Sequence, residues 1–142
     1  MKLATVLVTI SVLAHHIIAY HHGTQHTLLG IEMAAWQTGF INGVILILPV
    51  LGLGLLWTRW RTVGAYAVMT GMLGALVFGI VHHYLVMSPD HISRLPAAEP
   101  HVHGVFIWTA AAIAMLEGVA GMSAAYVAAA SRKFNLGASH VV

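Results

Sequence analysis

Cysteine is absent from this chain, and charged residues are scarce. The 142 residues include no cysteine, and only 7% of them are Asp, Glu, Lys or Arg. Without cysteine the chain cannot form disulfides, thiolate zinc sites, iron–sulfur clusters or covalently attached c-type haem. The metal ligands that remain are imidazole, carboxylate and thioether, which suit copper, zinc, iron, manganese or a non-covalent haem.

The chain is instead rich in apolar residues. It is 59% hydrophobic, with a mean hydropathy of +0.86. Several apolar runs approach or exceed the roughly 20 residues that span a bilayer. We therefore expect an integral membrane protein with a single transmembrane domain over residues 1–142. Its expected surroundings are membrane lipids, and the composition does not indicate a nucleic-acid partner.

Apolar runs and turn residues predict an all-α bundle of four transmembrane helices. Gly23 and Gly30 bracket the first connection, and Pro89 and Pro100 bound a longer third connection, which alone has the length to fold over a site. The predicted helices cover residues 3–20, 31–57, 62–86 and 102–131.

Basic residues predict the orientation in the membrane. Arg94 lies alone at one side, and five residues lie at the other: Lys2, Arg59, Arg61, Arg132 and Lys133. The positive-inside rule then predicts that both termini are cytoplasmic, in a prokaryotic plasma (inner) membrane. Residues 3–13 also resemble the apolar core of a secretory signal, but we expect an uncleaved helix.

The chain has 11 histidines, and ten of them fall within residues 15–26, 82–91 and 101–103. In the predicted topology these three stretches lie at the periplasmic or outer side. Polar side chains near lipid are usually kept where they have a function. Glu32 and Glu99 each follow sixteen residues after a histidine pair. This weak repeat suggests two helical hairpins related as parallel repeats.

Helical spacing selects candidate ligands among these histidines. His83 continues a row of small residues, and His103 shares a helix face with Glu117. One residue of the adjacent pair His15 and His16 can face the same seam. The predicted metal or haem ligands are therefore His15 or His16, His83 and His103, with Glu32 as the nearest carboxylate.

The other polar residues receive secondary roles. Five further histidines are secondary metal candidates: His22, His26, His82, His91 and His101. For all of these except His82, and also for His21, the alternative is a simple position in the headgroup region. Glu117 lies near the middle of its helix. It is either an acid that is hydrogen-bonded to a neighbour such as Asn42, or part of a proton or ion path with Asn42.

His22-x-x-x-His26 resembles one histidine box of the membrane-bound di-iron hydroxylases and desaturases. The resemblance covers these five residues only. The other histidine pairs lack the preceding histidine, three positions upstream, that the further boxes of those enzymes carry. The chain is therefore not assigned to that family.

These features favour a small membrane subunit that binds a transition metal or haem b and serves a respiratory or oxidative complex. Copper is favoured over iron and zinc as the metal. The expected role is electron transfer or a non-catalytic one, because a four-helix bundle offers little room for a substrate pocket beside a cofactor. The alternatives are a purely structural accessory subunit and a metal-ion transporter or delivery protein. The expected partners are other membrane subunits or further copies of the chain.

Overall fold

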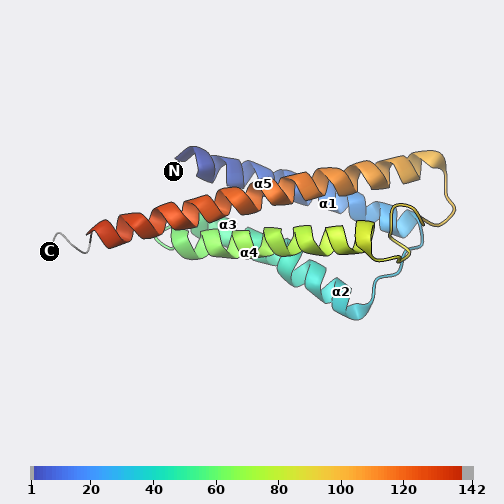
Figure 1. Cartoon of the computed structure of the whole chain (residues 1–142), viewed down its shortest axis with the longest axis horizontal. Helices are drawn as coiled ribbons and strands as arrows, with labels where there is room; N and C mark the ends of the chain where they lie inside the picture. Colours follow the sequence, from blue (N-terminus) through green and yellow to red (C-terminus); the bar gives the residue numbers. More distant parts are fainter. Residues whose placement is uncertain (1, 139–142) are drawn as a thin grey trace.

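The computed structural model describes residues 2–138, with side chains from Lys2 to Arg132, and this part of the chain is all-helical. Four helical runs follow one another along the chain (Figure 1). They are α1 (Lys2–Leu28); α2 (Ala35–Phe40), the π-helical η1 (Ile41–Ile47) and α3 (Leu48–Leu56); α4 (Arg61–Ile80) and the π-helical η2 (Val81–Leu85); and α5 (Pro100–Ala138). Among the described residues, each of the four runs is long and apolar enough to cross a membrane. The prediction of four such helices is confirmed.

The first helix extends further than hydropathy predicted. We expected it to end near residue 20, but α1 continues to Leu28. Gly30 then adopts a left-handed backbone with a φ of 63°. Its N–H donates to the carbonyl of Thr27, and the N–H of Ile31 donates to the carbonyl of His26. This pair of bonds is a Schellman motif, which satisfies the last carbonyls of a helix and favours glycine at this position.

Two further boundaries have clear causes. Pro100 is the first residue of α5, which suits proline because the first helical N–H has no partner within the helix. In the second run, η1 widens the helix directly before Pro49. A proline inside a helix cannot donate a hydrogen bond, and its ring crowds the carbonyl four residues earlier. The wider turns of a π-helix relieve that crowding.

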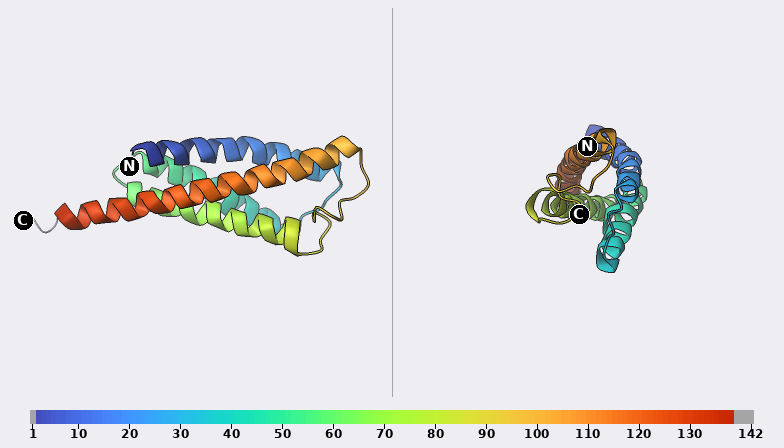
Figure 2. Two further views of the ribbon diagram at one scale, coloured as in Figure 1. Left: turned by 45° about the horizontal axis from the view of Figure 1, so that its top comes forward. Right: turned by 90° about the vertical axis from the view of Figure 1, so that its right-hand side faces the viewer.

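The helices pack closely at the end that holds the two termini. Helix α5 lies alongside α1 and α4, and α3 packs on α4 (Figure 2). Gly52 and Gly64 let the backbones of α3 and α4 approach each other, as small residues do in membrane helix pairs. The apolar core at this end includes the fully buried Val8, Val68 and Met72.

The opposite end is closed by a loop rather than by a helix. Residues 86–99 connect η2 to α5 and turn back toward the bundle (Figure 1). Ile92 and Leu95 of this loop pack against a second apolar cluster, which contains Ile31 and Phe106. This loop and the end of α1 are therefore parts of one packed unit.

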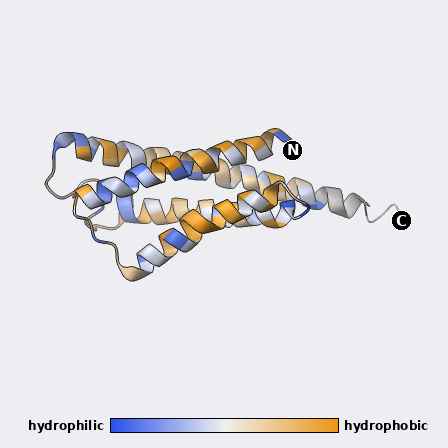
Figure 3. Cartoon of the chain, turned by 180° about the vertical axis from the view of Figure 1, so that it is seen from behind, coloured by the Kyte–Doolittle hydropathy of each residue, from blue (hydrophilic) through white to orange (hydrophobic). Residues whose placement is uncertain are grey.

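The outer surface is apolar over most of its length (Figure 3). Large side chains such as Ile17, Tyr20 and Trp108 are more than two-thirds exposed. In water such a surface is a liability, whereas in a bilayer it faces lipid. This surface agrees with the membrane class that the composition predicted.

The pairing of helices bears on the two-hairpin hypothesis. Helices α4 and α5 pack along each other, as a hairpin does. Helix α1, however, packs mainly on α5, and it meets the second run mainly through α3. Helix α2 diverges from the bundle (Figure 1). The internal repeat therefore stays a prediction.

Candidate metal centre

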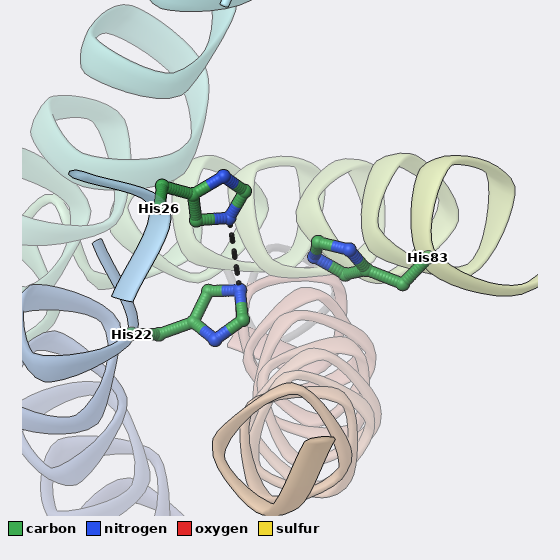
Figure 4. Close-up of side chains that lie close together, drawn as sticks. All are labelled: His22, His26 and His83. Carbon is green, nitrogen blue, oxygen red and sulfur yellow. Dashed lines mark hydrogen bonds between the residues drawn. The ribbon is translucent and has the colours of Figure 1, made fainter. Parts of the chain in front are cut away.

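Three histidine side chains converge where α1 and η2 approach each other. His22 and His26 come from α1, and His83 comes from η2 (Figure 4). One ring nitrogen from each histidine lies within 4.8 Å of the corresponding nitrogen of the other two. The exposed fraction is 7% for His22 and 9% for His26. We call these three residues the tri-histidine cluster.

The length of α1 places two of these ligands on one helix face. Residues four apart on an α-helix are neighbours on its surface. Because α1 continues to Leu28, His22 and His26 both belong to its buried face, which also contains His15. The Nε2 atoms of His22 and His26 are 3.2 Å apart.

Hydrogen bonds on the outer side of two rings define which nitrogen faces the cluster. The hydroxyl of Thr109 on α5 donates to backbone carbonyls of its own helix, so its Oγ1 accepts from Nδ1–H of His22 at 2.8 Å. The carbonyl of Asp90 accepts from Nδ1–H of His83 at 3.1 Å. A neutral imidazole that donates through Nδ1 has a lone pair on Nε2. Metal-binding histidines are commonly oriented in this way by acceptors behind the ring.

His26 differs from the other two because its Nδ1 is buried and has no hydrogen-bond partner among the described residues. Its Nε2–H can donate to Nε2 of His22, which is the only hydrogen bond within the cluster. A buried polar atom without a partner is costly. If a metal ion bound Nε2, the ring proton would move to Nδ1, so the tautomer of His26 depends on occupancy of the cluster.

One aromatic side chain packs against all three histidines of the cluster. Phe106 of α5 is fully buried. Its ring centroid lies 4.5 Å from that of His22, 5.1 Å from that of His26 and 5.3 Å from that of His83. Side chains held by packing keep one rotamer, so Phe106 limits movement of all three imidazoles.

The loop of residues 86–99 secures His83 from the other side. The N–H of Ile92 donates to the carbonyl of His83, and Nε2–H of His91 donates to the carbonyl of Tyr84. Asp90 is only 3% exposed, and its carboxylate accepts a hydrogen bond from the hydroxyl of Ser88. Its Oδ2 lies 3.7 Å from Nδ1 of His83. This loop therefore positions one of the three candidate ligands.

A second polar pair lies deeper between the helices. Nε2 of His15 and Oε1 of Glu117 are 3.1 Å apart, and both side chains are buried. The partner of Glu117 is therefore His15 and not Asn42, the neighbour that the sequence suggested. Asn42 is exposed, so it lies outside the interior that a path through Glu117 would need.

The cluster and the pair both line one cavity of about 760 Å³. The cavity wall includes His22, His26 and His83 and, further in, His15 and Glu117. Its volume is in the range of small-molecule sites. The expectation that the bundle leaves little room beside a metal site is therefore wrong.

The remaining predicted ligands lie apart from the cluster. Nδ1 of His16 lies 2.8 Å from the carbonyl oxygen of Val12, and its Nε2 lies 3.0 Å from the carbonyl oxygen of Leu46. A neutral imidazole has one N–H, so it donates to only one of these carbonyls at a time. Nε2–H of His103 donates to the carbonyl of Pro96 at 2.7 Å and so braces the loop. Glu32 is exposed. Of the four histidines named first, only His83 belongs to the cluster.

The secondary candidates divide in the same way. His22 and His26 join the cluster. His91 braces the loop, His101 is exposed, and the ring of His82 stacks at a tilt on Phe78 with a centroid distance of 4.4 Å. The neighbouring residues His82 and His83 thus have different roles, which helical geometry predicts because adjacent side chains point about 100° apart.

Sequence reasoning did not find Thr109, Phe106 or Asp90. The available signal was the spacing of His22 and His26, which becomes informative once the first helix is extended to Gly30. No spacing along the chain relates Asp90 to His83, because that contact depends on how the loop turns back.

Comparison with known proteins does not identify a family. No family model, curated protein or solved structure matches this chain.

Proposed function

We propose that this protein is a small integral-membrane subunit that binds one transition-metal ion, with copper favoured, at His22, His26 and His83. The observation that supports it is the direction of the lone pairs. Thr109 and Asp90 accept the outer ring protons of two histidines, so both inner Nε2 atoms are available to a cation. Without an ion, Nε2 of His22 can accept only from Nε2–H of His26, which leaves Nδ1 of His26 buried without a partner among the described residues. A bound ion would take both Nε2 lone pairs and leave the ring proton of His26 on Nδ1.

The spacing of the rings suits a single ion. A tetrahedral ion with metal–nitrogen bonds of about 2.0–2.1 Å has its ligand nitrogens about 3.3 Å apart. The pair His22 and His26 is already at 3.2 Å. Small shifts of His83 within the 4.8 Å limit would complete a three-nitrogen site. Because all three residues line the cavity, a fourth position would face open space, as in sites where a metal reacts with an outside molecule.

The donor set favours a borderline or soft transition metal. Calcium and magnesium prefer oxygen ligands, and the cluster presents three imidazoles. Non-haem iron sites typically have two histidines and a carboxylate, whereas Asp90 lies behind His83 rather than within the cluster. Three imidazoles fit copper and also zinc, which differ in redox chemistry.

The arrangement of the rings favours an ion over haem b. Phe106 packs against all three imidazoles, and the ring centroids of His22 and His26 are 4.9 Å apart, so no macrocycle fits between these two rings. Axial ligands of a haem come from opposite faces of the ring, whereas His22 and His26 are successive residues of one helix face.

The proposed location is a prokaryotic plasma membrane with the tri-histidine cluster near the outer side. The end of the bundle that holds the termini carries the described basic residues Lys2, Arg59, Arg61 and Arg132, while Arg94 lies in the loop beside the cluster. The side chain of Lys133 lies outside the described residues. By the positive-inside rule this charge distribution supports cytoplasmic termini. A metal at the outer side is accessible to a redox partner of a respiratory or oxidative complex.

Metal content after purification in mild detergent tests the proposed function. We expect about one copper ion per chain in the wild type, and its loss in His22→Ala, His26→Ala and His83→Ala, because a two-imidazole site binds weakly. The matched controls are the adjacent residues, His21→Ala and His82→Ala, which should retain the metal.

Each alternative predicts a different result. Zinc in place of copper would overturn the redox role while keeping the site. A Soret band would indicate haem b. A wild-type chain that neither copurifies with a metal nor binds Cu(I), Cu(II) or Zn(II) would contradict the proposed function and favour a structural accessory subunit. Copurifying chains, identified by mass spectrometry, test the role as a subunit.

A further inference from the structure

The cavity has two buried polar regions on a mostly apolar wall. One region is the tri-histidine cluster, and the other is the buried pair of His15 and Glu117. The wall between and around them is built mostly from apolar side chains, among them Ile45, Phe78 and Ile113. The other polar side chains on the wall are at least partly exposed: His16, Tyr20, Thr24, Thr27, Thr38 and Tyr84. A cavity of this kind suits a molecule with an apolar body and polar groups at defined places.

The two regions are held at a defined separation along the helices. His15 and His22 are seven residues apart on α1, which corresponds to about 10 Å of helix rise. Helix α5 runs in the opposite direction and repeats the arrangement, with Glu117 bonded to His15 and Thr109 bonded to His22. Between them α5 presents only small or aliphatic side chains, including Ala110 and Ala114. The space between the two polar regions is therefore open and apolar.

The deeper region has unused hydrogen-bonding capacity. Oε2 of Glu117 and Nδ1 of His15 are buried and have no hydrogen-bond partner among the described residues. The side chain of Glu117 is 3% exposed, and that of His15 is 0% exposed. Leaving such atoms unpaired in an apolar interior is costly. A carboxyl group can donate a hydrogen bond to a ligand carbonyl or accept one from a ligand hydroxyl.

We infer that this cavity binds a lipid-soluble ring compound with an oxygen atom at each end, of the quinone or quinol class. One oxygen would hydrogen-bond with the pair of His15 and Glu117, and the other would face the tri-histidine cluster. An acyl chain has a polar group at one end only, so it would leave one of the two regions unpaired. The inference goes beyond the proposed function because a ring oxygen can meet the imidazoles with or without a metal.

The walls of the cavity also indicate a route from the membrane. Tyr20 and Thr27 of α1 and Thr38 of α2 line the cavity and are exposed at the surface. In Figure 1, α2 diverges from the rest of the bundle on this side. The cavity therefore reaches the surface between α1 and α2, within two predicted membrane-spanning segments. A ligand dissolved in lipid can reach it without crossing water.

Direct binding to protein in phosphatidylcholine nanodiscs tests the inference, with decylubiquinone as the probe. Quinone retained after gel filtration is counted against protein-free nanodiscs. We expect saturable binding of about one quinone per chain. Ala114→Phe, which fills the cavity, and Glu117→Leu, which removes the polar contact, should each weaken binding about tenfold or more. Glu117→Gln keeps a hydrogen-bonding group and should bind within a few-fold of wild type.

The controls separate this inference from protein stability and from the metal site. Ala129→Phe makes the same substitution at an exposed position of α5 and should bind quinone as the wild type does. His83→Ala removes a proposed metal ligand but keeps the pair of His15 and Glu117. Residual quinone binding in that variant, measured together with its metal content, distinguishes failure of one proposal from failure of the other.

Three results would overturn the inference. Retention equal to that of protein-free nanodiscs would show that the quinone only partitions into lipid. Wild-type binding by both Ala114→Phe and Glu117→Leu would place the ligand elsewhere. Equal competition by a simple alkane such as hexadecane would show that the cavity recognises a hydrocarbon chain and no oxygen. If Ala114→Phe fails to fold by circular dichroism, Glu117→Leu and the competition experiment decide.

Discussion

At the scale of single residues, the roles of the histidines depend on the atoms behind each ring. His22 and His83 each donate from Nδ1 to an outer acceptor, so their Nε2 atoms can bind a cation. His103 uses its Nε2–H to hold the loop at Pro96, so that nitrogen is already engaged. The residue type is the same in all three cases, and the hydrogen-bond partner decides the chemistry.

Thr109→Val tests this dependence on the outer acceptor. The substitution keeps the shape of the side chain but removes the oxygen that orients His22, so we expect metal affinity to fall by about 10- to 100-fold with the fold intact. Competition with a chromophoric chelator measures the Kd. Thr70→Val makes the same change at an exposed position of α4 and should leave the Kd unchanged. Equal affinity in both variants would contradict the orienting role of Thr109.

At the scale of secondary-structure elements, the ends and irregularities of the helices position the site. Gly30 ends α1 only after His22 and His26 have been placed on its buried face. His83 lies in the π-helical turn η2, where the loop of residues 86–99 bonds back to the same segment. π-Helical turns often occur at functional sites because they alter the direction of a side chain.

The close packing of α3 on α4 can be tested by substituting a glycine at their contact. A Cβ atom at Gly52 would lie 2.8 Å from the carbonyl oxygen of Gly64, which is backbone and cannot rotate away. We expect Gly52→Ala to destabilise the protein by about 1–3 kcal/mol, measured by unfolding in detergent. Gly54→Ala is the matched control on the same helix, because its Cβ would meet nothing within 4 Å. Equal stability of the two variants would show that the helices are not in close contact in the membrane.

At the scale of the whole molecule, charged residues gather at the two ends of the bundle, and apolar side chains cover most of the surface between them. The carboxylates of Glu32, Asp90 and Glu99 lie in connections at the end with the tri-histidine cluster, whereas Lys2, Arg59 and Arg61 lie at the opposite end. The four helical runs between these ends are mostly apolar on their exposed faces (Figure 3).

Cysteine labelling in intact cells tests the orientation, because the native chain contains no cysteine. We expect a membrane-impermeant maleimide to label Ala97→Cys from outside and Thr58→Cys only after permeabilisation. Both positions are exposed and lie in connections at opposite ends of the bundle. The reverse pattern would place the cluster at the cytoplasmic side.

Three features follow from the sequence alone: the apolar composition typical of membrane proteins, the four helices, and the unequal distribution of basic residues between the two ends of the bundle. Each depends on sums over many residues, such as apolar runs and the distribution of Arg and Lys, and such sums tolerate local errors. The histidine stretches lie at the end of the bundle where His22, His26 and His83 come together. Within those stretches the choice of His83 agreed with the cluster, whereas His15, His16 and His103 have other partners.

Only the tertiary structure decided which histidines meet. The sequence predicts that His22 and His26 lie in a connection, because hydropathy falls after Tyr20, but the helix does not end there. Helix α1 continues to Leu28 before Gly30 ends it. Contacts between residues far apart in the chain then orient the rings, with Thr109 behind His22 and Asp90 behind His83. Periodicity describes one helix at a time. The distance between two side chains on different helices depends on where each helix ends and how the loop between them packs.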